Sequence, residues 1–557
     1  MVSVRSVAAG TRSVAGALSL AALASCAAPA TPARANAPSS PADAASFDWR
    51  RRPIYLAMTD RFANGDARND DAGQPGCHDP SSPDLFHGGD VAGLRAHVAY
   101  LAELGAGALW VTPLPAQVPL RSGACGYHGY WADLTDPDDG RMEPKLGTVD
   151  DVRALVADLH ARGIRFVADM VVNHAGRGAR IVAEHPAWFH DDATCAALGA
   201  TEGRPADPVV NCSLHGLPDF AEEDPVVASY LTGLSRRWVE RVGPDGIRLD
   251  TAKHVPARYL ATSFVPGVRS ARSDLFLLAE YFDADDVAHV RPVLDAGFDS
   301  AFHFPLHAAL VDAFAKGGSV DAVASAVAAT YGALGEDRAL RLVTFLDNHD
   351  VPRFLSEAPP DTPADLLARR YAVALAALFT LPGIPQLYQG DELAMLGAHG
   401  QNRADMPAWA WTAEGRAGAH DGFAGDAAAT WALVERLARL RAAEEGLWRG
   451  SFVELLRQGV HGNVLAYLRG DVLVVLSNDA SSVTVPLRFG ALAPWPDGTV
   501  LREMLGLGAP ATLAVARGKA TVALPPLTAA VYVEAARPAT GPARPAADAR
   551  TPATEAH

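Results

Sequence analysis

Residues 246–250 read Gly246-Ile247-Arg248-Leu249-Asp250, a short apolar run that ends on a carboxylate. Residues 276–280 and 343–350 repeat the pattern and bring the chain to Glu280 and Asp350. An ionised carboxylate is costly inside a core, so a buried strand that ends on one needs a reason. A barrel of parallel strands supplies the reason, because its C-terminal rim carries the active site. These segments therefore predict a barrel with three acids at its rim.

The region from Pro53 to about Arg441 alternates strand-like runs with amphipathic helices, which predicts βα units and a parallel sheet. Eight strands are expected, at Ile54–Thr59, Ala108–Val111, Arg165–Met170, Gly246–Leu249, Phe276–Ala279, Ser300–Phe304, Leu342–Phe345 and Ile384–Tyr388. Helical patterns between them include Val91–Leu104, Val149–Arg162 and Pro225–Val242. Eight strands with intervening helices predict an α/β fold of the (β/α)8 TIM-barrel type over residues 47–445.

Two further regions depart from this alternation. The connection over residues 171–245 is too long for one helix and two short loops, so a small subdomain is expected at about 175–222. After Glu445, period-two strands predict a C-terminal antiparallel β-sandwich over residues 446–535. These strands are expected at Asn463–Leu468, Val472–Leu476, Ser482–Leu487, Thr499–Glu503 and Ala530–Val533.

Both ends of the chain have the composition of unfolded segments. Arg5 and Arg12 lie at the start of the chain, and the apolar stretch that follows, from about Val14 to Leu23, is too short to span a bilayer. This pattern predicts an export signal over residues 1–25. The sequence Leu23-Ala24-Ser25-Cys26 resembles a bacterial lipobox, which implies a lipid anchor at Cys26; an ordinary secretory signal is the alternative. The Ala/Pro/Ser-rich residues 26–46 predict a flexible tether, and residues 536–557 a disordered tail.

Composition and charge limit the kinds of molecule that this protein is expected to bind. The chain has 557 residues, 49% of them hydrophobic, and a formal net charge of −16 without any long Lys/Arg run. This argues against nucleic-acid binding and against an anionic membrane surface. We expect an exported monomer, at the cell surface or outer membrane as a lipoprotein, or else secreted or periplasmic.

The cysteines suit export. If Cys26 is lipidated, four of the five remain, and an even number in an exported protein predicts two disulfides. The favoured pairing is Cys77–Cys125 with Cys195–Cys212, because it closes the shortest loops; free thiols are the alternative. No Cys-x-x-Cys occurs, so zinc and thioredoxin-like chemistry have no support.

The three rim acids differ in their neighbours. Retaining hydrolysis of a glycosidic bond needs two carboxyl groups about 5 Å apart, one nucleophilic and one protonated. Arg248 lies on the same strand face as Asp250 and should lower its pKa, which suits a nucleophile. Glu280 follows an apolar run, so desolvation should raise its pKa and suit it to acid/base catalysis. Asp350 follows His349, and such a pair can grip vicinal sugar hydroxyls.

Five ordered segments resemble the sequence regions of the α-amylase family, glycoside hydrolase family 13. They are residues 169–174, 246–254, Glu280, 345–350 and, for the fifth region, 217–220. The resemblance covers roughly residues 53–535. It implies Asp250 as nucleophile, Glu280 as acid/base and Asp350 as transition-state stabiliser.

The same resemblance implies further sugar-binding residues. It assigns sugar contacts or orienting roles to Arg248, His174 and His349, an aromatic platform to Tyr130, leaving-group positions to Lys253 and His254, and an acceptor-side aromatic to Phe282. Residues 397–403 lack the first Asp of the family's Asp-Pro-x-Asn-Arg segment but keep Arg403. These residues also have structural interpretations. An acid at a strand end could serve only to cap a loop, Tyr130 could serve only to pack in the core, and Asp169 could serve only to orient Arg248.

Two calcium sites are also implied. The turn at residues 64–70, with Gly88 and Asp90, is similar to a calcium loop of cyclodextrin glucanotransferases and related amylases. Its implied ligands are Asn64, Asp66, Asn69, Asp70, the Gly88 carbonyl and Asp90; ordinary Asx-turn chemistry is the alternative. The second, more widespread family site implies Asn173, Asp219 and the carbonyl of His254.

The sequence therefore predicts a calcium-dependent, retaining, endo-acting α-1,4-glucan hydrolase acting on starch, glycogen or maltodextrins. An α-glucanotransferase or cyclomaltodextrin-degrading enzyme is the alternative within the family. A catalytically silent glycan-binding lipoprotein is the alternative from another class, and the three intact acids argue against it.

Overall fold

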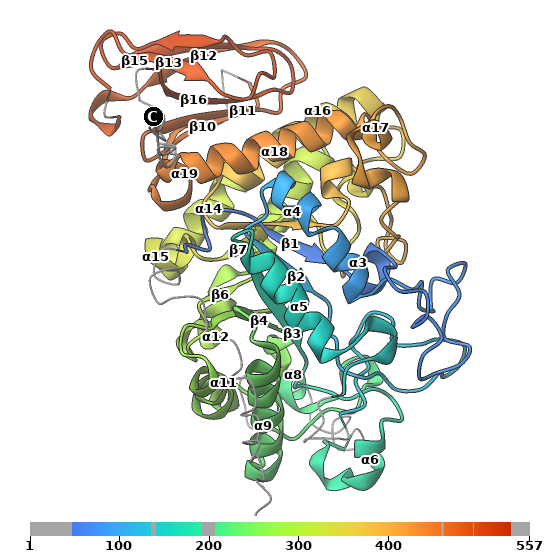
Figure 1. Cartoon of the computed structure of the whole chain (residues 1–557). Coiled ribbons are helices and arrows are strands. Elements are labelled where there is room, and N and C mark those ends of the chain that lie inside the picture. Colours follow the sequence, from blue (N-terminus) through green and yellow to red (C-terminus); the bar gives the residue numbers. More distant parts are fainter. Residues whose placement is uncertain (1–46, 135–140, 192–206, 458–461, 494, 536–557) are drawn as a thin grey trace, which may run out of the picture. The chain divides into compact units, whose positions relative to one another are not determined.

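Eight parallel strands form one sheet in the order β6-β5-β4-β3-β2-β1-β8-β7. They are β1 (Ile54–Ala57), β2 (Ala108–Val111), β3 (Arg165–Met170), β4 (Gly246–Leu249), β5 (Phe276–Ala279), β6 (Ser300–Ala301), β7 (Val343–Phe345) and β8 (Ile384–Tyr388). A parallel bridge between Phe302 and Val343 joins the two ends of this order. The closed circuit confirms the predicted (β/α)8 barrel (Figure 1).

The computed structural model describes residues 47–134, 141–191, 207–457, 462–493 and 495–535. The chain divides into two units, residues 1–47 and residues 48–557, and every element described below belongs to the second. The predicted export signal, tether and C-terminal tail lie outside the described residues. Within the described ranges, no helix is both long enough and apolar enough to cross a membrane.

The helices alternate with the barrel strands. Those between β1 and the C-terminal sheets are α2 (Thr59–Phe62), α3 (Val91–Ala96), α4 (Val98–Leu104), α5 (Val149–His160), α6 (Arg180–Glu184), α8 (Pro208–Asn211), α9 (Pro225–Val242), α10 (Ala257–Tyr259), α11 (Val265–Ala271), α12 (Arg291–Asp295), α13 (Phe304–Leu310), α14 (Val320–Leu334), α15 (Glu336–Ala339), α16 (Ala364–Thr380), α17 (Ala413–Arg416), α18 (Ala427–Ala443) and α19 (Glu445–Arg449). Their ends follow local chemistry: Thr148 and Asp151 form a capping box at α5, and Gly243 ends α9 in the left-handed region.

Several predicted boundaries were wrong, and three of these differences bear on the barrel rim or its helices. The expected helix Val91–Leu104 is two helices, because His97 leaves the helical region with φ −111° and ψ 17°. The first strand ends at Ala57, since Thr59 already begins α2, and the sixth ends at Ala301 shortly before α13 begins at Phe304. In both strands, a helix begins where the last residues of the apolar run were expected to continue the strand.

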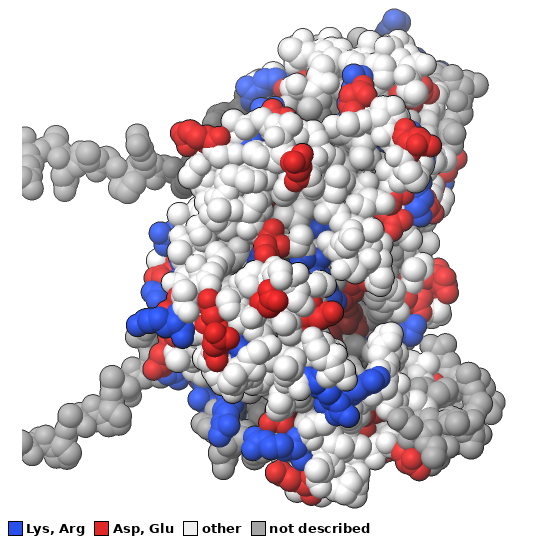
Figure 2. Space-filling model, turned by 90° about the vertical axis from the view of Figure 1, so that its right-hand side faces the viewer, with Lys and Arg blue, Asp and Glu red and all other residues white. Residues whose placement is uncertain are grey.

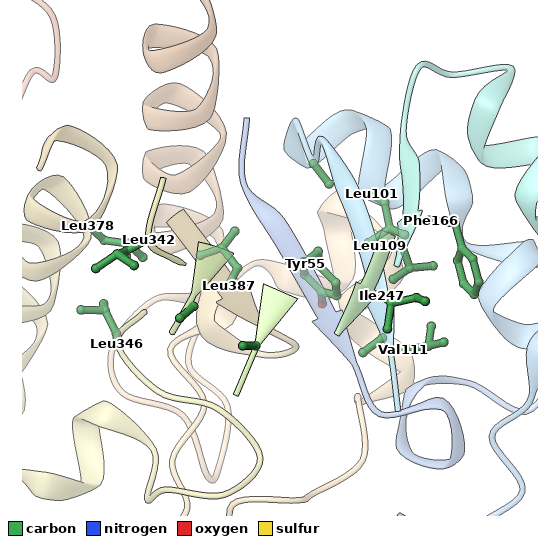
Figure 3. Close-up of a cluster of buried hydrophobic side chains, with 14 of the residues drawn as sticks. Tyr55, Leu101, Leu109, Val111, Phe166, Ile247, Leu342, Leu346, Leu378 and Leu387 are labelled. Atoms are coloured by element: carbon green, nitrogen blue, oxygen red, sulfur yellow. The ribbon is translucent and has the colours of Figure 1, made fainter. Parts of the chain in front are cut away.

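The strands are apolar on both faces because each face is buried. In β2, Leu109 and Val111 pack against the helices, whereas Ala108 and Trp110 fill the barrel interior. Figure 3 shows the outer layer, in which Leu109, Val111 and Ile247 lie close to Leu101 and Phe166. Burial of both faces explains why these strands read as continuous apolar runs.

The long connection between β3 and α9 holds the predicted insertion. It includes α6 and α8, and two isolated antiparallel bridges, His174 with Asp219 and Phe189 with Phe220, fold it back on the end of β3. Cys212 is disulfide-bonded, and its predicted partner Cys195 lies outside the described residues. The predicted Cys77–Cys125 disulfide is confirmed.

The C-terminal part forms two antiparallel sheets, ordered β14-β13-β16-β11-β10-β9 and β12-β15. The strands are β9 (Phe452–Leu456), β10 (Val464–Arg469), β11 (Val472–Ser477), β12 (Val483–Arg488), β13 (Val500–Glu503), β14 (Thr512–Ala514), β15 (Lys519–Leu524) and β16 (Ala529–Glu534). A shared apolar core includes Leu473 of one sheet and Val522 of the other, as expected for a sandwich. Strands β9, β14 and β15 were not predicted.

On the face that Figure 2 shows, charge is spread rather than collected into one patch. Figure 2 shows acidic side chains interspersed with basic ones on one face of the molecule. This distribution agrees with the absence of a long basic run in the sequence.

The Cys77–Cys125 disulfide closes a loop of 48 residues, so its removal should release chain entropy in the unfolded state. We expect the double variant Cys77→Ser/Cys125→Ser to lose roughly 2–4 kcal/mol of unfolding free energy. Denaturant melts of the variant against wild type measure the loss. Equal midpoints for both proteins would contradict a structural role for this bond.

Candidate active site

A single buried guanidinium joins the acids at the barrel rim. Arg248, in β4, donates from Nη1 to Asp250 Oδ1 at 2.6 Å and to Asp169 Oδ1 at 2.9 Å. Its Nη2 lies 2.6 Å from Glu280 Oε1, an ion pair rather than an aligned hydrogen bond. Arg248 is fully buried, and Asp250 and Glu280 are only 5% and 6% exposed. Three strand ends are thus tied together by one side chain.

This arrangement corrects one expectation. From the sequence we expected Arg248 to contact Asp250 alone. That expected contact was the reason for assigning different roles to Asp250 and Glu280. The structure shows that Arg248 contacts both acids. The orienting role expected for Asp169 is seen directly in its hydrogen bond to Arg248.

Glu280 lies in surroundings that favour its protonated form. Desolvation raises the pKa of Glu280 well above its usual value, the charges of Asp250 and Asp350 act in the same direction, and Arg248 opposes them. Its second oxygen accepts a hydrogen bond from the Thr251 amide at 2.9 Å. Thr251 has φ +47°, a strained conformation for a β-branched residue. The strained turn after β4 therefore directs a backbone N–H at the Glu280 carboxyl group. This hydrogen bond favours the ionised form, but burial outweighs it and the pKa stays raised.

Asp350 has the opposite balance. Burial alone would raise its pKa, but His349 and Arg403 outweigh burial and hold the pKa below its ordinary value. Arg403 Nη2 donates to Asp350 Oδ1 at 3.1 Å, and His349 Nε2 lies 3.2 Å from Asp350 Oδ2. In this structure Arg403, predicted to bind sugar, contacts an acid of the site itself.

Tyr130 is a half-buried ring between the acids and His349. Its hydroxyl donates to Asp169 Oδ2 at 2.9 Å, and its oxygen lies 2.7 Å from His349 Nε2. The two rings are nearly parallel, with centroids 5.4 Å apart. His174 is placed beside them, because its Nε2 lies 3.2 Å from the Tyr130 carbonyl. The structure thus brings together Tyr130, His174 and His349 as predicted.

The residues expected on the leaving-group side lie after β4 and β5. Lys253 Nζ donates to the Phe282 carbonyl at 3.3 Å and pairs with Asp283 at 3.2 Å. Phe282 is 46% exposed and packs on Phe304 at 4.1 Å between centroids. His254 Nδ1 lies 2.7 Å from the Val209 carbonyl, which ties this rim to the inserted subdomain.

Three supporting residues were missed from the sequence. Trp110 Nε1 donates to Asp169 at 3.0 Å, and Asn402 Nδ2 donates to the His349 and Val351 carbonyls at 2.9 and 2.8 Å. Arg353 is fully buried, 3.6 Å from both Asp347 and Asp391. A buried Trp in a strand and an Arg near Asp350 were visible signals, but Asp169, the partner of Trp110, and Asp391, one of the two partners of Arg353, come from distant segments.

The second implied calcium set fits a cation. Asn173 is fully buried, and its Oδ1 has no hydrogen-bond donor, although its Nδ2 lies 3.3 Å from His174 Nδ1. Asp219 lies beside it through the bridge of Asp219 with His174. An oxygen without a donor in a buried site is what a hard cation would coordinate.

The first implied set fits less fully. Asn69 Oδ1 is buried without a donor, and Gly88 lies close against Asn64 and Asp70, as a cradle for an ion requires. Asp90, however, accepts from four N–H groups, those of Gly65, Asp66, Asn69 and Gly93, and caps α3. Asp66 pairs with Arg68. These two carboxylates already have other partners.

In the residues that the structure describes, His, Cys, Asp and Glu side chains do not by themselves form a metal site, at the two implied sets or outside them. The described parts of the chain contain no cluster of three or more His, Cys, Asp or Glu side chains arranged for a metal. Both implied calcium sets therefore depend on amide and carbonyl oxygens as well as carboxylates.

Known proteins match this chain over most of its length. The family model for the alpha-amylase catalytic domain matches residues 56–192 and 210–421. A cyclomaltodextrinase from Bacillus sp. is 30% identical over 78% of this chain and 74% of its own length. A beta/alpha-amylase from Paenibacillus polymyxa is 31% identical over 64% of this chain, which spans only 29% of that protein.

Solved structures agree. An alpha-amylase from Anoxybacillus superimposes with a TM-score of 0.72 at 29% identity, covering 88% of this chain and 98% of that one. An alpha-amylase from Geobacillus thermoleovorans in complex with acarbose gives a TM-score of 0.69 at 28% identity, covering 87% and 98%.

The raised pKa of Glu280 has a consequence for stability. A carboxyl group whose pKa is raised by folding contributes stability below its unfolded pKa, about 4.3, and loses it as pH rises through the folded value. We expect Glu280→Gln to gain unfolding free energy relative to wild type as pH rises from 4 to 8. Urea melts at each pH measure the difference; a difference that stays constant or falls with pH would contradict the burial effect.

Proposed function

The chain belongs to the alpha-amylase family and has the barrel of a glycoside hydrolase or transferase, and we propose that it hydrolyses α-1,4-glucosidic bonds inside starch, glycogen or maltodextrins with retention. The observation that carries this proposal is the buried contact of Arg248 with Asp250 and Glu280. Two carboxyl groups sharing one guanidinium are close enough for a two-step displacement, and burial gives one of them a raised pKa.

The proposed reaction uses each acid once in each step. Asp250 attacks the anomeric carbon and forms a glycosyl ester while Glu280 gives its proton to the departing glycosidic oxygen. Glu280, now ionised, takes a proton from water, whose oxygen attacks the same carbon and releases Asp250. Retention follows because the carbon is inverted twice.

The remaining groups bind the sugar around that carbon. Asp350, whose pKa is held low by His349 and Arg403, is an ionised acceptor for sugar hydroxyls. Tyr130 offers a half-buried ring that suits the apolar face of a pyranose, and His174 and His349 flank it. Lys253 and His254 would serve the leaving-group side.

Transfer to another sugar is the second candidate activity. Phe282 is a large apolar side chain left 46% exposed, two residues after Glu280, where it offers a stacking face to an incoming sugar. The similarity to a cyclomaltodextrinase makes cyclic maltodextrins a further candidate class of substrate. A purely binding protein would have no use for the buried acid pair.

A variant series with a product time course tests the mechanism. We expect Asp250→Asn and Glu280→Gln each to lower kcat on soluble starch by at least about a thousandfold, since both chemical steps need them. Asp295→Asn, an exposed pair with Arg338, is the control and should leave kcat unchanged.

The products decide between the two activities. Linear maltooligosaccharides of falling length support hydrolysis, whereas cyclic or lengthened products support transfer. Full turnover by Asp250→Asn would overturn the proposed nucleophile. Starch binding without any products in wild type would overturn catalysis altogether.

We propose a calcium ion at Asn173, Asp219 and the His254 carbonyl, where it would tie the inserted subdomain to the rim. A bound ion would supply positive charge to Asn173 Oδ1, the buried oxygen of this set that has no donor. The loop at residues 64–90 is a second proposed site, drawing on Asn64, Asn69, Asp70 and the Gly88 carbonyl.

Chelation tests both calcium sites together. We expect EDTA to lower the melting temperature by several degrees, because removal of a ligand bound only by the folded state lowers stability. Restored Ca2+ should restore the melting temperature, with Mg2+ as the comparison ion. A melting temperature unaffected by EDTA would contradict both sites.

A further inference from the structure

Arg353 is a fully buried cation in the loop that follows β7. Its guanidinium carbon lies 3.8 Å from the centroid of the Tyr388 ring, and its Nη2 donates to Met395 Sδ at 3.3 Å. In the part of the chain that the structure describes, its Nε and Nη1 have no hydrogen-bond partner. A guanidinium is costly to bury unless nearby carboxylates offset its charge.

Two carboxyl groups from neighbouring strand ends lie beside Arg353. Its Nη1 is 3.6 Å from Asp347 Oδ1, two residues after β7, and 3.6 Å from Asp391 Oδ1, three residues after β8. The three side chains are at most 3% exposed, so water screens their attraction little. The ion pair therefore joins the loop after β7 to the loop after β8.

The charges within this group nearly balance. Burial raises the pKa of both carboxyl groups, and the charge of Asp347 raises the pKa of Asp391 further, well above its usual value. The hydrogen bond between the two groups needs one proton, and Asp391 holds it. Arg353 thus faces one carboxylate and one carboxylic acid.

Asp347 closes the loop that carries His349 and Asp350. Its Oδ2 accepts from the Phe354 amide at 2.6 Å, so one hydrogen bond spans residues 348–353. A displacement of Asp347 would therefore change the base of this loop and the direction of the two side chains at its tip.

Asp391 is fixed to the barrel. Its Oδ2 accepts from the Tyr388 amide at 2.8 Å, and its carbonyl oxygen accepts from the hydroxyl of Tyr371, in α16, at 2.8 Å. The Arg353 amide also donates to the Gly397 carbonyl at 2.9 Å. Arg353 thus holds the loop after β7 through its side chain and through its backbone.

We propose that Arg353 is a positioning residue for the loop after β7. Its ion pair with Asp347 and Asp391 fixes the base of the loop, and His349 and Asp350 are thereby held where they meet the sugar. The inference rests on the proposed function, which places these two side chains at the sugar. Because Arg353 is fully buried, it acts only through the loop. Contacts realised in the transition state affect kcat most, so loss of Arg353 should lower kcat more than it raises KM.

Kinetics on soluble starch with matched variants test this role. We expect Arg353→Met to lower kcat at least about thirtyfold with less than about a threefold change in KM, and Arg353→Lys to recover part of the loss because it keeps the charge. Arg338→Met, which removes an exposed partner of Asp295, is the control and should leave kcat unchanged. If Arg353→Met does not fold, Arg353→Lys carries the test, with kcat expected about threefold or more below wild type. Wild-type kcat in the variant that carries the test would overturn the proposal.

A double variant separates positioning from charge balance. Arg353→Met alone leaves Asp347 ionised and buried, which also lowers stability. In Arg353→Met/Asp347→Asn both charges are gone, so the melting temperature should recover toward wild type while kcat stays low, because the tie to Asp391 is still missing. Recovery of kcat together with the melting temperature would show that Arg353 only balances charge.

Hydrogen exchange gives a readout that does not depend on turnover. Amides of residues 347–354 should exchange faster in Arg353→Met, or in Arg353→Lys if that variant carries the test, than in wild type, whereas amides of residues 246–254 should exchange at the same rate. Unchanged exchange in both segments would overturn the proposal. If wild type cleaves no α-glucan, the proposed function fails, and exchange still decides whether Arg353 holds this loop.

Discussion

The site depends on one buried guanidinium that binds three carboxylates. Arg248 reaches Asp169, Asp250 and Glu280, which come from the ends of β3, β4 and β5. The contact requires the parallel register that places Arg248 opposite Asp169 on one side and Leu278 on the other. A shift of one residue in β4 would turn Arg248 toward the helices and leave the acids unpaired. Register, burial and charge are therefore set together.

Around that contact, the structure divides the acids by their surroundings. Glu280 is buried, has a raised pKa and receives a backbone amide from the strained Thr251. Asp350 is held ionised by His349 and Arg403, and Asn402 fixes the backbone on either side of it. A proton donor and a persistent anion thus lie at one rim. This separation of two neighbouring carboxyl groups is what acid/base chemistry at neutral pH requires.

The sequence predicted the barrel and the position of its rim acids because both follow from local pattern. An apolar run such as residues 276–279 that ends on Glu280 is readable without knowing any neighbour. Contacts between neighbouring strands could not be predicted, because they depend on strand register. The sequence predicted the contact of Arg248 with Asp250 but not its contact with Glu280. Trp110 and Asn402 were missed for the same reason, since their partners lie in other segments, as does Asp391, one of the two partners of Arg353. The helix expected over residues 91–104 is broken at His97, where the backbone leaves the helical region, and no local sequence signal marked that break.

The central claim is that Asp250 attacks the sugar while Glu280 serves as the acid. Its most direct test is to trap the glycosyl ester with a 5-fluoro-α-glucosyl fluoride and to map the labelled peptide by mass spectrometry. The account predicts one added 5-fluoroglucosyl group per chain, attached at Asp250 after loss of the anomeric fluoride. A label on Glu280 or Asp350, or turnover without any trapped ester, would contradict it.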